Sequence, residues 1–263
     1  MNDKIHTFVI CAYKESPYLE ECIKSVVLQK SYSDIIMVTS TPNMYIYGLC
    51  EKYGIPLYIN EGDKGITQDW EFALKKVTTP LATITHQDDI YYAGYAKEVI
   101  EAYKENNSML IFFCDYYEIR GTSVVKKNRL LTIKRAMLFP LRIKSLTKAK
   151  WIRRLILSFG SPICCPSVAY CLENLPSQRF YNNFRTNEDW EAWERYSKLD
   201  GDFIYFSEAL MAHRIHEESE TSLMIKDTGR SKEDYEMFLK FWPSFMAKFL
   251  TKQYKRSEDS NKI

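Results

Sequence analysis

Residues 7–29, TFVICAYKESPYLEECIKSVVLQ, decide the fold because they join a buried strand to a helix through one short polar turn. The apolar run Thr7–Tyr13 predicts a strand that is covered on both faces. Ser16 can cap a helix with Pro17 at its first position. Apolar residues then recur on one helical face, at Leu19, Cys22, Ile23, Val26 and Val27. The stretch therefore predicts a strand, a polar turn and an amphipathic helix over 18–29.

The same alternation of strand and helix continues outward to about residue 90. Apolar runs predict strands at 34–39, 56–60 and 81–85, with helices that start after Asn43 and cover about 67–77. Nearly continuous apolar strands that alternate with helices are typical of a parallel sheet covered on both faces. We therefore expect an α/β fold with a Rossmann-like, mostly parallel central sheet flanked by helices.

The rest of the chain adds further strands and a helical end. It predicts helices at 92–105 and 187–197, strands at 109–119 and 202–206, and an amphipathic helix at 232–254. The sequence shows no internal repeat and no flexible linker. We expect one domain over residues 1–222, with a C-terminal helical extension, residues 223–263, packed on it.

Composition places the chain among globular proteins: 46% of its 263 residues are hydrophobic and 27% are charged. No run approaches the roughly 20 apolar residues that span a bilayer, and the N-terminus lacks the pattern of a signal peptide. The seven cysteines show no C-x-x-C spacing, and several lie in apolar runs. These features predict a cytoplasmic protein.

Polar clusters follow three of the predicted strands directly. They are Tyr13–Ser16, Ser40–Asn43 and His86–Asp89. Because right-handed crossovers bring the carboxyl ends of parallel strands to one edge, we expect these clusters to meet there. That edge is where ligands of such sheets bind, so it is the predicted site.

The adjacent acids Asp88 and Asp89 allow two interpretations. Carboxylate oxygens after a buried strand suit Mg²⁺ or Mn²⁺, which would also offset the repulsion between the two charges. Either acid could instead cap the helix that follows near Tyr92. The dipeptide alone does not decide between them.

Two later clusters could complete such a site. In His213-Arg214-Ile215-His216 a guanidinium lies between two imidazoles, which suits a phosphate group. Glu188-Asp189 opens a predicted helix, where an acid can be a capping charge or a general base. A cation, an arginine and carboxylates together favour a diphosphate ligand.

The order of these segments resembles a family 2 glycosyltransferase of the GT-A fold. Residues 8–29 resemble the first strand, acidic loop and helix of that family, and residues 65–74, GITQDWEFAL, resemble its G-x-x-x-A-R-N segment without the Arg-Asn. ITHQDD at 84–89 occupies the place of the D-x-D element, with His86 in place of the first acid. The block from Asn187 to Ser222 resembles the E-D-W and R-x-H motifs.

This resemblance implies a role for several residues. Asp189 would be the base that deprotonates the acceptor hydroxyl, with Glu188 as the second candidate, and Trp190 would pack near the acceptor or serve as a core aromatic. Asp88, Asp89 and His216 would bind the metal. Nucleotide-sugar binding would fall to Ala12, Tyr13, Glu15, Ser40, Asp69, Asp88 and Arg214.

The function implied is metal-assisted transfer, with inversion, of a hexosyl or N-acetylhexosaminyl group from a nucleoside-diphosphate sugar, expected to be a UDP-sugar. The cofactor would be Mn²⁺ or Mg²⁺, the acceptor a glycan or lipid-linked saccharide, and the role polysaccharide biosynthesis of the cell envelope. The alternatives are a non-catalytic nucleotide-sugar or glycan-binding protein and a nucleotidyltransferase, although no Gly-rich phosphate loop follows the first strand.

A basic segment separates the two halves of the chain. Between Gly121 and Leu172 there are eleven Lys or Arg and no Asp or Glu. This segment could be a solvated face, or a peripheral contact of residues 126–154 with an anionic membrane. No motif of a nucleic-acid-binding class is present, so no nucleic-acid partner is expected.

Overall fold

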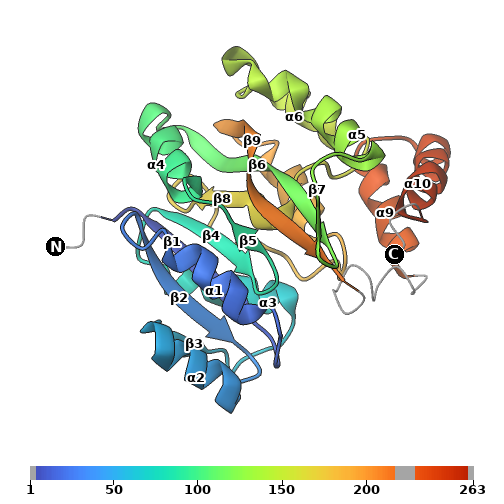
Figure 1. Cartoon of the computed structure of the whole chain (residues 1–263). Helices are drawn as coiled ribbons and strands as arrows, with labels where there is room; N and C mark the ends of the chain where they lie inside the picture. The colour runs from blue at the N-terminus through green and yellow to red at the C-terminus, as the bar shows by residue number, and fades with distance from the viewer. Residues whose placement is uncertain (1–3, 217–228, 260–263) are drawn as a thin grey trace.

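The computed structural model describes residues 4–216 and 229–259, and it is built on a twisted mixed sheet (Figure 1). The described residues form nine strands in the order β3-β2-β1-β4-β8-β6-β9-β5, with β7 paired to β6. The first four, β1 (His6–Ala12), β2 (Ser33–Thr39), β3 (Leu57–Ile59) and β4 (Leu81–His86), are mutually parallel. The predicted mostly parallel α/β sheet is therefore confirmed.

Helices cover both faces of this half. They are α1 (Leu19–Val27), α2 (Met44–Tyr53), α3 (Ile66–Lys76) and α4 (Tyr95–Glu105). Phe8 and Ile10 on β1 pack with α1, α2 and α4, whereas Val9 packs with Ala73 of α3 on the opposite face. Alternate β1 residues thus enter different cores, which explains why the strand reads as continuously apolar.

Helix starts were predicted with mixed success. Asn43 caps α2 by accepting a hydrogen bond from the Ile46 amide at 2.9 Å. Ser16 does not cap α1 as predicted, because the helix starts at Leu19 and the Ser16 hydroxyl accepts instead from the Tyr18 amide. The polar turn is therefore two residues longer than the Ser-Pro signal suggests.

The second half extends the sheet. After β5 (Ile90–Tyr91), the long strand β6 (Met109–Arg120) pairs with β7 (Ser123–Val125), and β8 (Val168–Cys171) lies antiparallel between β4 and β6. Strand β9 (Asp202–Ile215) runs parallel to β6. It is nine residues longer than the predicted strand ending at Phe206, so the His213–His216 cluster lies at its carboxyl end.

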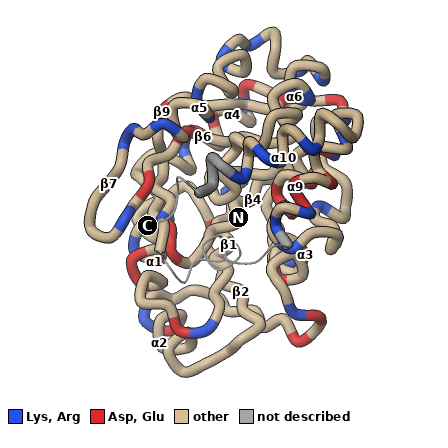
Figure 2. Tube along the Cα trace, turned by 90° about the vertical axis from the view of Figure 1, so that its right-hand side faces the viewer, with Lys and Arg blue, Asp and Glu red and all other residues tan. Residues whose placement is uncertain are grey.

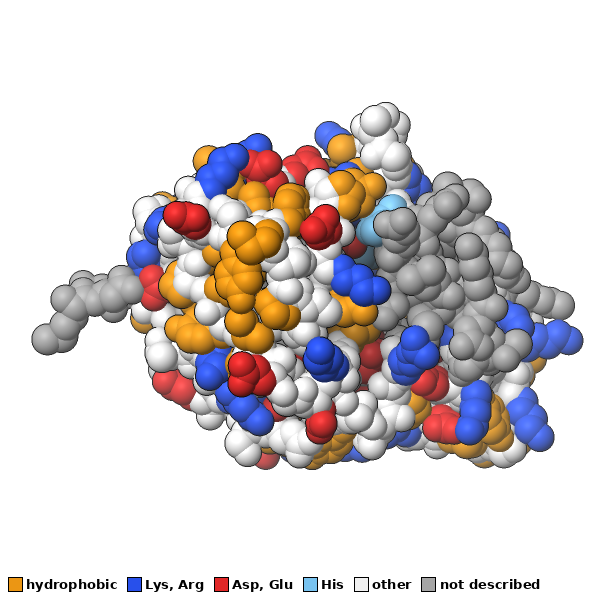
Figure 3. All heavy atoms as spheres, turned by 90° about the horizontal axis from the view of Figure 1, so that it is seen from below, with side chains coloured by type: hydrophobic (Ala, Val, Ile, Leu, Met, Phe, Trp, Pro, Cys, Tyr) orange, Lys and Arg blue, Asp and Glu red, His pale blue; other side chains and the backbone are white. Residues whose placement is uncertain are grey.

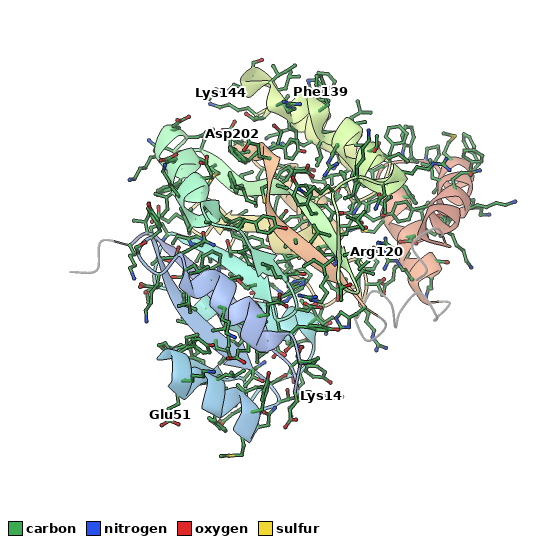
Figure 4. All side chains as sticks on the ribbon, viewed as in Figure 1. Lys14, Glu51, Arg120, Phe139, Lys144 and Asp202 are labelled. Atoms are coloured by element: carbon green, nitrogen blue, oxygen red, sulfur yellow. The ribbon has the colours of Figure 1, made fainter. Side chains whose placement is uncertain are left out.

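The basic segment forms a helical layer rather than a loop. It contains α5 (Arg129–Leu138), two short 3-10 turns, η1 (Phe139–Arg142) and η2 (Lys144–Leu146), and α6 (Lys150–Leu157). A third 3-10 turn, η3 (Cys165–Ser167), leads into β8. Phe139 and Lys144 lie at the outer end of this layer (Figure 4).

The C-terminal extension forms two helices where one was predicted. They are α9 (Gly229–Leu239) and α10 (Ser244–Asp259), with Pro243 at the break, which proline favours. Both pack against α7 (Glu188–Tyr196): the ring of Trp190 lies 5.1 Å from Phe238 and 5.7 Å from Tyr254. The predicted boundary at residue 222 falls outside the described residues.

Candidate functional site

Asp89 joins the end of β4 to the end of β9. Its side chain is fully buried, and its Oδ1 accepts hydrogen bonds from the Arg214 amide at 2.9 Å and from His213, whose Nδ1 lies 2.9 Å away. Asp89 therefore does not cap the following helix, which was the alternative considered from the sequence. That helix starts at Tyr95, and its N-cap residue Gly94 lies five positions beyond Asp89. The acid holds two segments of chain together.

Asp88 and Arg214 form the second link between the same strand ends. Asp88 Oδ2 lies 2.9 Å from His216 Nε2, and Arg214 Nε donates to the Asp88 carbonyl at 3.0 Å. The guanidinium also pairs with Glu21 of α1 at 2.6 Å and lies over the ring of Tyr18. The strand ends and α1 thereby hold the arginine in one orientation.

His86 brings a third possible ligand to the pair. Ligand atoms of His86, Asp88 and Asp89 lie within 4.8 Å of one another, and the His86 ring stacks on Trp70 of α3. Asp89 Oδ2 and His86 Nε2 are buried and have no hydrogen-bond partner among the described residues. Because an unpaired buried carboxylate oxygen is costly, these atoms fit a divalent cation.

The charges of this cluster support one another. Burial would raise the pKa of Asp88, but the hydrogen bond from His216 and the nearby imidazoles outweigh it, so the pKa is lowered. Burial would lower the pKa of His213, but Asp89 outweighs it, so that pKa is raised. The cluster therefore favours charged acids, as cation binding requires.

Polar residues at the ends of β1 and β2 form the next part of the edge. The amide of Tyr13 donates to the Gln87 side chain at 2.9 Å, and Gln87 donates back to the Tyr13 carbonyl. Lys14 adopts a left-handed φ of 55°, and its amide donates to Thr41 at 2.6 Å (Figure 4). This backbone conformation is costly for a residue other than glycine, so the surrounding contacts must hold the turn in place.

Ser40 and Asp69 are in contact at the same edge, as expected of two residues that were both assigned to nucleotide-sugar binding. Ser40 donates to Asp69 Oδ2 at 2.7 Å, and Asn60 donates to Asp69 Oδ1 at 2.7 Å. Asn60 was not among the residues predicted for this edge. It directly follows β3, so it occupies the same position relative to its strand as the other polar clusters.

Asp89 and Arg214 are buried at the strand ends, and three further assigned residues also do not line the cavity described below. Ala12 is buried in the sheet core and Glu15 is exposed on the turn, and neither lines the cavity described below. Trp190 is fully buried, and its indole donates to the Leu157 carbonyl at 3.1 Å. Of the two roles considered for Trp190, this position agrees with that of a core aromatic residue.

A single large cavity connects these groups. It has a volume of about 1050 Å³ and extends from Tyr13, Ser40 and Asp69 past His86 and Asp88 to the start of α7. There it is lined by Glu188 and Asp189, the two candidate bases. Burial raises the pKa of Asp189 above its ordinary value, against the opposing effect of the Trp190 amide that donates to it at 2.6 Å. The donor edge and the candidate base thus share one space.

The basic segment divides into residues with different surroundings. Lys134 of α5 lines the cavity and donates to the Tyr116 hydroxyl at 2.9 Å. Arg153 is fully buried and donates to the carbonyls of Leu199 and Gly201, so it cannot contact a membrane. Figure 2 shows the Lys and Arg of this layer spread along α5 and α6 instead of forming one patch.

Sheet and site together define the class of protein. A Rossmann-like sheet whose strand ends place a His-Asp-Asp group and a clamped arginine beside a cavity that Asp189 also lines is a GT-A glycosyltransferase architecture. Residues 7–162 match the family model described as Glycosyl transferase family 2. The chain belongs to that family.

Solved structures agree on the fold at low sequence identity. A mannosyltransferase from Pyrobaculum calidifontis in complex with GDP-Man and Mn²⁺ superposes with a TM-score of 0.63 at 15% identity, over 94% of this chain and 69% of that one. S. aureus TarS 1-349 in complex with UDP-GlcNAc gives 0.61 at 14% identity, over 94% and 70%.

A third similar structure is glucosyl-3-phosphoglycerate synthase from Mycobacterium tuberculosis in complex with Mn²⁺ and UDP-glucose. Its TM-score is 0.54 at 14% identity, over 84% of this chain and 78% of that one. The search of curated proteins gave no significant match.

Proposed function

We propose that the protein transfers a sugar, with inversion, from a UDP-sugar to a glycan or lipid-linked saccharide acceptor, with Asp189 as the base. The observation that carries this proposal is the shared cavity: His86 and Asp88, which belong to the candidate metal group with the buried Asp89, line the same space as Asp189. A binding protein would need the first group alone. A buried acid across the cavity adds what transfer requires.

The donor would lie along the strand ends. The exposed ring of Tyr13 and the Ser40-Asp69-Asn60 contacts suit a base and ribose, and the complexes of similar proteins contain UDP-GlcNAc, UDP-Glc or GDP-Man. His86, Asp88 and Asp89 would hold Mn²⁺ or Mg²⁺, which would neutralise charge on the diphosphate. Arg214 and His216 would contact the phosphates from the other side.

The chemical step would use groups of this chain at two places. Asp189 would accept the proton of the acceptor hydroxyl as that oxygen attacks the anomeric carbon, and the bond to the nucleoside diphosphate would break. Its raised pKa makes it a stronger base than an ordinary exposed aspartate. Arg214, fixed by Glu21 and Tyr18, would stabilise the charge that develops on the leaving group.

The acceptor side of the cavity supports an acceptor with an apolar part. Ile133, Met137 and Leu250 line it, and Phe159 both lines it and is half exposed. Exposed Trp151 and Leu155 continue from Phe159 at four-residue spacing along α6. This apolar surface continues the segment 126–154 and supports a peripheral membrane contact of a cytoplasmic enzyme in polysaccharide assembly. The described residues contain no helix long and apolar enough to cross a bilayer.

The test of this proposal is nucleotide release from UDP-GlcNAc, UDP-glucose and GDP-mannose, with Mn²⁺ and a panel of saccharide acceptors. We expect one donor to be turned over and Asp189→Asn to lower its kcat at least about 100-fold, because general-base catalysis contributes roughly 10²–10⁴-fold. Asp200→Asn, an exposed aspartate in the same half of the chain, is the control. Tight UDP binding with no turnover of any donor would instead favour a binding protein.

A further inference from the structure

Helix α9 places two neighbouring carboxylates against the residues that precede α7. Glu233 Oε1 accepts from the Arg185 amide at 2.9 Å, and Oε2 accepts from the Thr186 amide at 2.8 Å and the Thr186 hydroxyl at 2.5 Å. One side chain thus receives three hydrogen bonds from two consecutive residues.

Asp234 continues this contact by one residue. Its Oδ1 accepts from the side chain of Asn187 at 2.9 Å, and both residues are buried. Asn187 occupies the N-cap position of α7 but makes no capping hydrogen bond with its own side chain. The carboxylates of α9 therefore hold residues 185–187, which precede α7. No side-chain hydrogen bond from within this segment caps the helix.

The segment held in this way leads directly into the candidate base. Arg185, Thr186 and Asn187 line the same cavity as Glu188 and Asp189. Helix α9 also supplies Arg230 to the cavity wall and packs Phe238 against Trp190. The family match ends at residue 162, so both α7 and α9 lie outside the matched residues.

We propose that Glu233, supported by Asp234, is a positioning residue: it fixes the segment 185–187 and through it the place of Asp189 in the cavity. This inference rests on the proposed function, because it requires Asp189 to act on the acceptor. The hydrogen bonds of Glu233 go to Arg185 and Thr186, not to the strand ends that carry the proposed donor-binding groups. Its removal should therefore impair the chemical step and leave nucleotide binding intact.

The expected kinetic effect follows from the precision that the reaction needs. A displacement of about 1 Å of a reacting group can cost roughly 100-fold in rate. We expect Glu233→Ala to lower kcat about 10- to 100-fold, with the Kd of UDP in the presence of Mn²⁺ unchanged within about twofold. Glu233→Gln keeps one acceptor oxygen and should retain an intermediate kcat.

The acid limb of the pH–rate profile gives a readout that general loss of stability would not move. The charged groups that face Asp189 are Arg230 of α9, Lys134 of α5 and His86 after β4, and Glu188 is its neighbour. A loosened segment would admit water to Asp189 and reduce the effect of burial. The limb should therefore move to lower pH in Glu233→Ala.

The experiment compares the full-length protein with Glu233→Ala, Glu233→Gln and a matched control, Glu236→Ala, which removes an exposed acid from the same helix. Turnover, the pH profile, UDP binding by calorimetry and amide hydrogen exchange at residues 185–190 are measured for each. The proposal is supported if Glu233→Ala has a lowered kcat, unchanged UDP binding and faster amide exchange at residues 185–190. Glu233→Gln should then restore part of the kcat, and Glu236→Ala should behave as the wild type does.

Two results would overturn the proposal. One is wild-type turnover by Glu233→Ala. The other is an equal loss of turnover and UDP binding, which would mean a general structural role. If the wild-type protein binds UDP but turns over no donor, the proposed function itself fails, and that outcome is separate from both.

Discussion

Asp89 has two oxygens in different surroundings, and this difference is central to the site. Oδ1 receives the Arg214 amide and the His213 ring, whereas Oδ2 has no hydrogen-bond partner among the described residues. Because the protein fixes the first oxygen, the second is the one that we propose as the metal ligand. His86, which stands where the family has an acid, places a ring nitrogen 3.9 Å from that oxygen.

His6 shows the contrasting case of a histidine with a purely structural role. It is fully buried, with its ring nitrogens 2.7 Å from Ser33 Oγ and 3.0 Å from Thr83 Oγ1. Burial lowers its pKa from 6.5 to about 3. The folded protein therefore binds this proton more weakly than the unfolded chain does.

This pKa predicts a pH dependence of stability. The neutral His6 makes its full contribution to the free energy of unfolding above pH 6.5, and this contribution is lost as the pH falls toward 3. The slope from this one group should approach about 1.4 kcal/mol per pH unit. Urea unfolding at several pH values should show a shallower slope for His6→Gln than for the wild type. Equal slopes in the two proteins would contradict the assignment.

At the scale of elements, α6 presents an unusual distribution of side chains. Its buried face contains Arg153, which bonds the carbonyls after α7, while Trp151 is 65% and Leu155 is 47% exposed. A helix that buries one of its two arginines and exposes its tryptophan and a leucine has an outer face suited to a partner. Near Lys148 and Arg142, both exposed, that partner is expected to be an anionic bilayer.

This surface makes a direct prediction about membrane binding. The double variant Trp151→Glu, Leu155→Glu should lose cosedimentation with phosphatidylglycerol vesicles, because it replaces apolar insertion with repulsion. Tyr32→Glu, which changes an exposed aromatic residue after α1, should bind as the wild type does. Unchanged binding of the double variant, or equal binding of the wild type to neutral vesicles, would remove the claim.

The sequence predicted the elements near β1 well and the later ones less well. Apolar runs identified β1, β2 and β4 within a residue, because each is buried on both faces. It could not foresee that β9 extends to Ile215, since Glu208 and its neighbours are exposed and break the apolar pattern. Nor could it separate Lys134, in the cavity, from Arg153, in the core, because only tertiary packing distinguishes them.

The candidate site was predicted in part for the same reason. His86–Asp89 and Ser40 follow buried strands, so topology alone brings them to one edge. The contact of Glu233 with Thr186 joins residues 47 positions apart and has no local signal. Trp190 shows the limit of a motif: its neighbour Asp189 reaches the cavity, while Trp190 itself packs in the core.

At the scale of the whole molecule, the cavity is built from both halves of the chain. The sheet edge from β1 to β4 supplies the donor side, and α5, α7, α9 and α10 supply the opposite wall. Figure 1 shows α5, α9 and α10 grouped on the far side of β6 and β9 from α1 and α2. Among the described residues on the face seen from below, acidic and basic side chains are interspersed (Figure 3).

This division predicts where donor and acceptor are recognised. The nucleotide should depend on residues inside the family match, 7–162, together with the end of β9, whereas acceptor choice should depend on the helices beyond residue 162. The hydrogen bonds that join the ends of β4 and β9 converge on Asp88 and Asp89. This pair of acids is therefore the point at which the account can be tested most directly.

The most direct measurement is anomalous scattering from a crystal of the full chain grown with UDP and Mn²⁺. We expect a manganese peak bonded to Asp89 Oδ2 and to His86 or Asp88, with the diphosphate between it and Arg214. In Asp89→Asn the peak should be lost. A diphosphate bound elsewhere, or manganese that avoids all three side chains, would contradict the account.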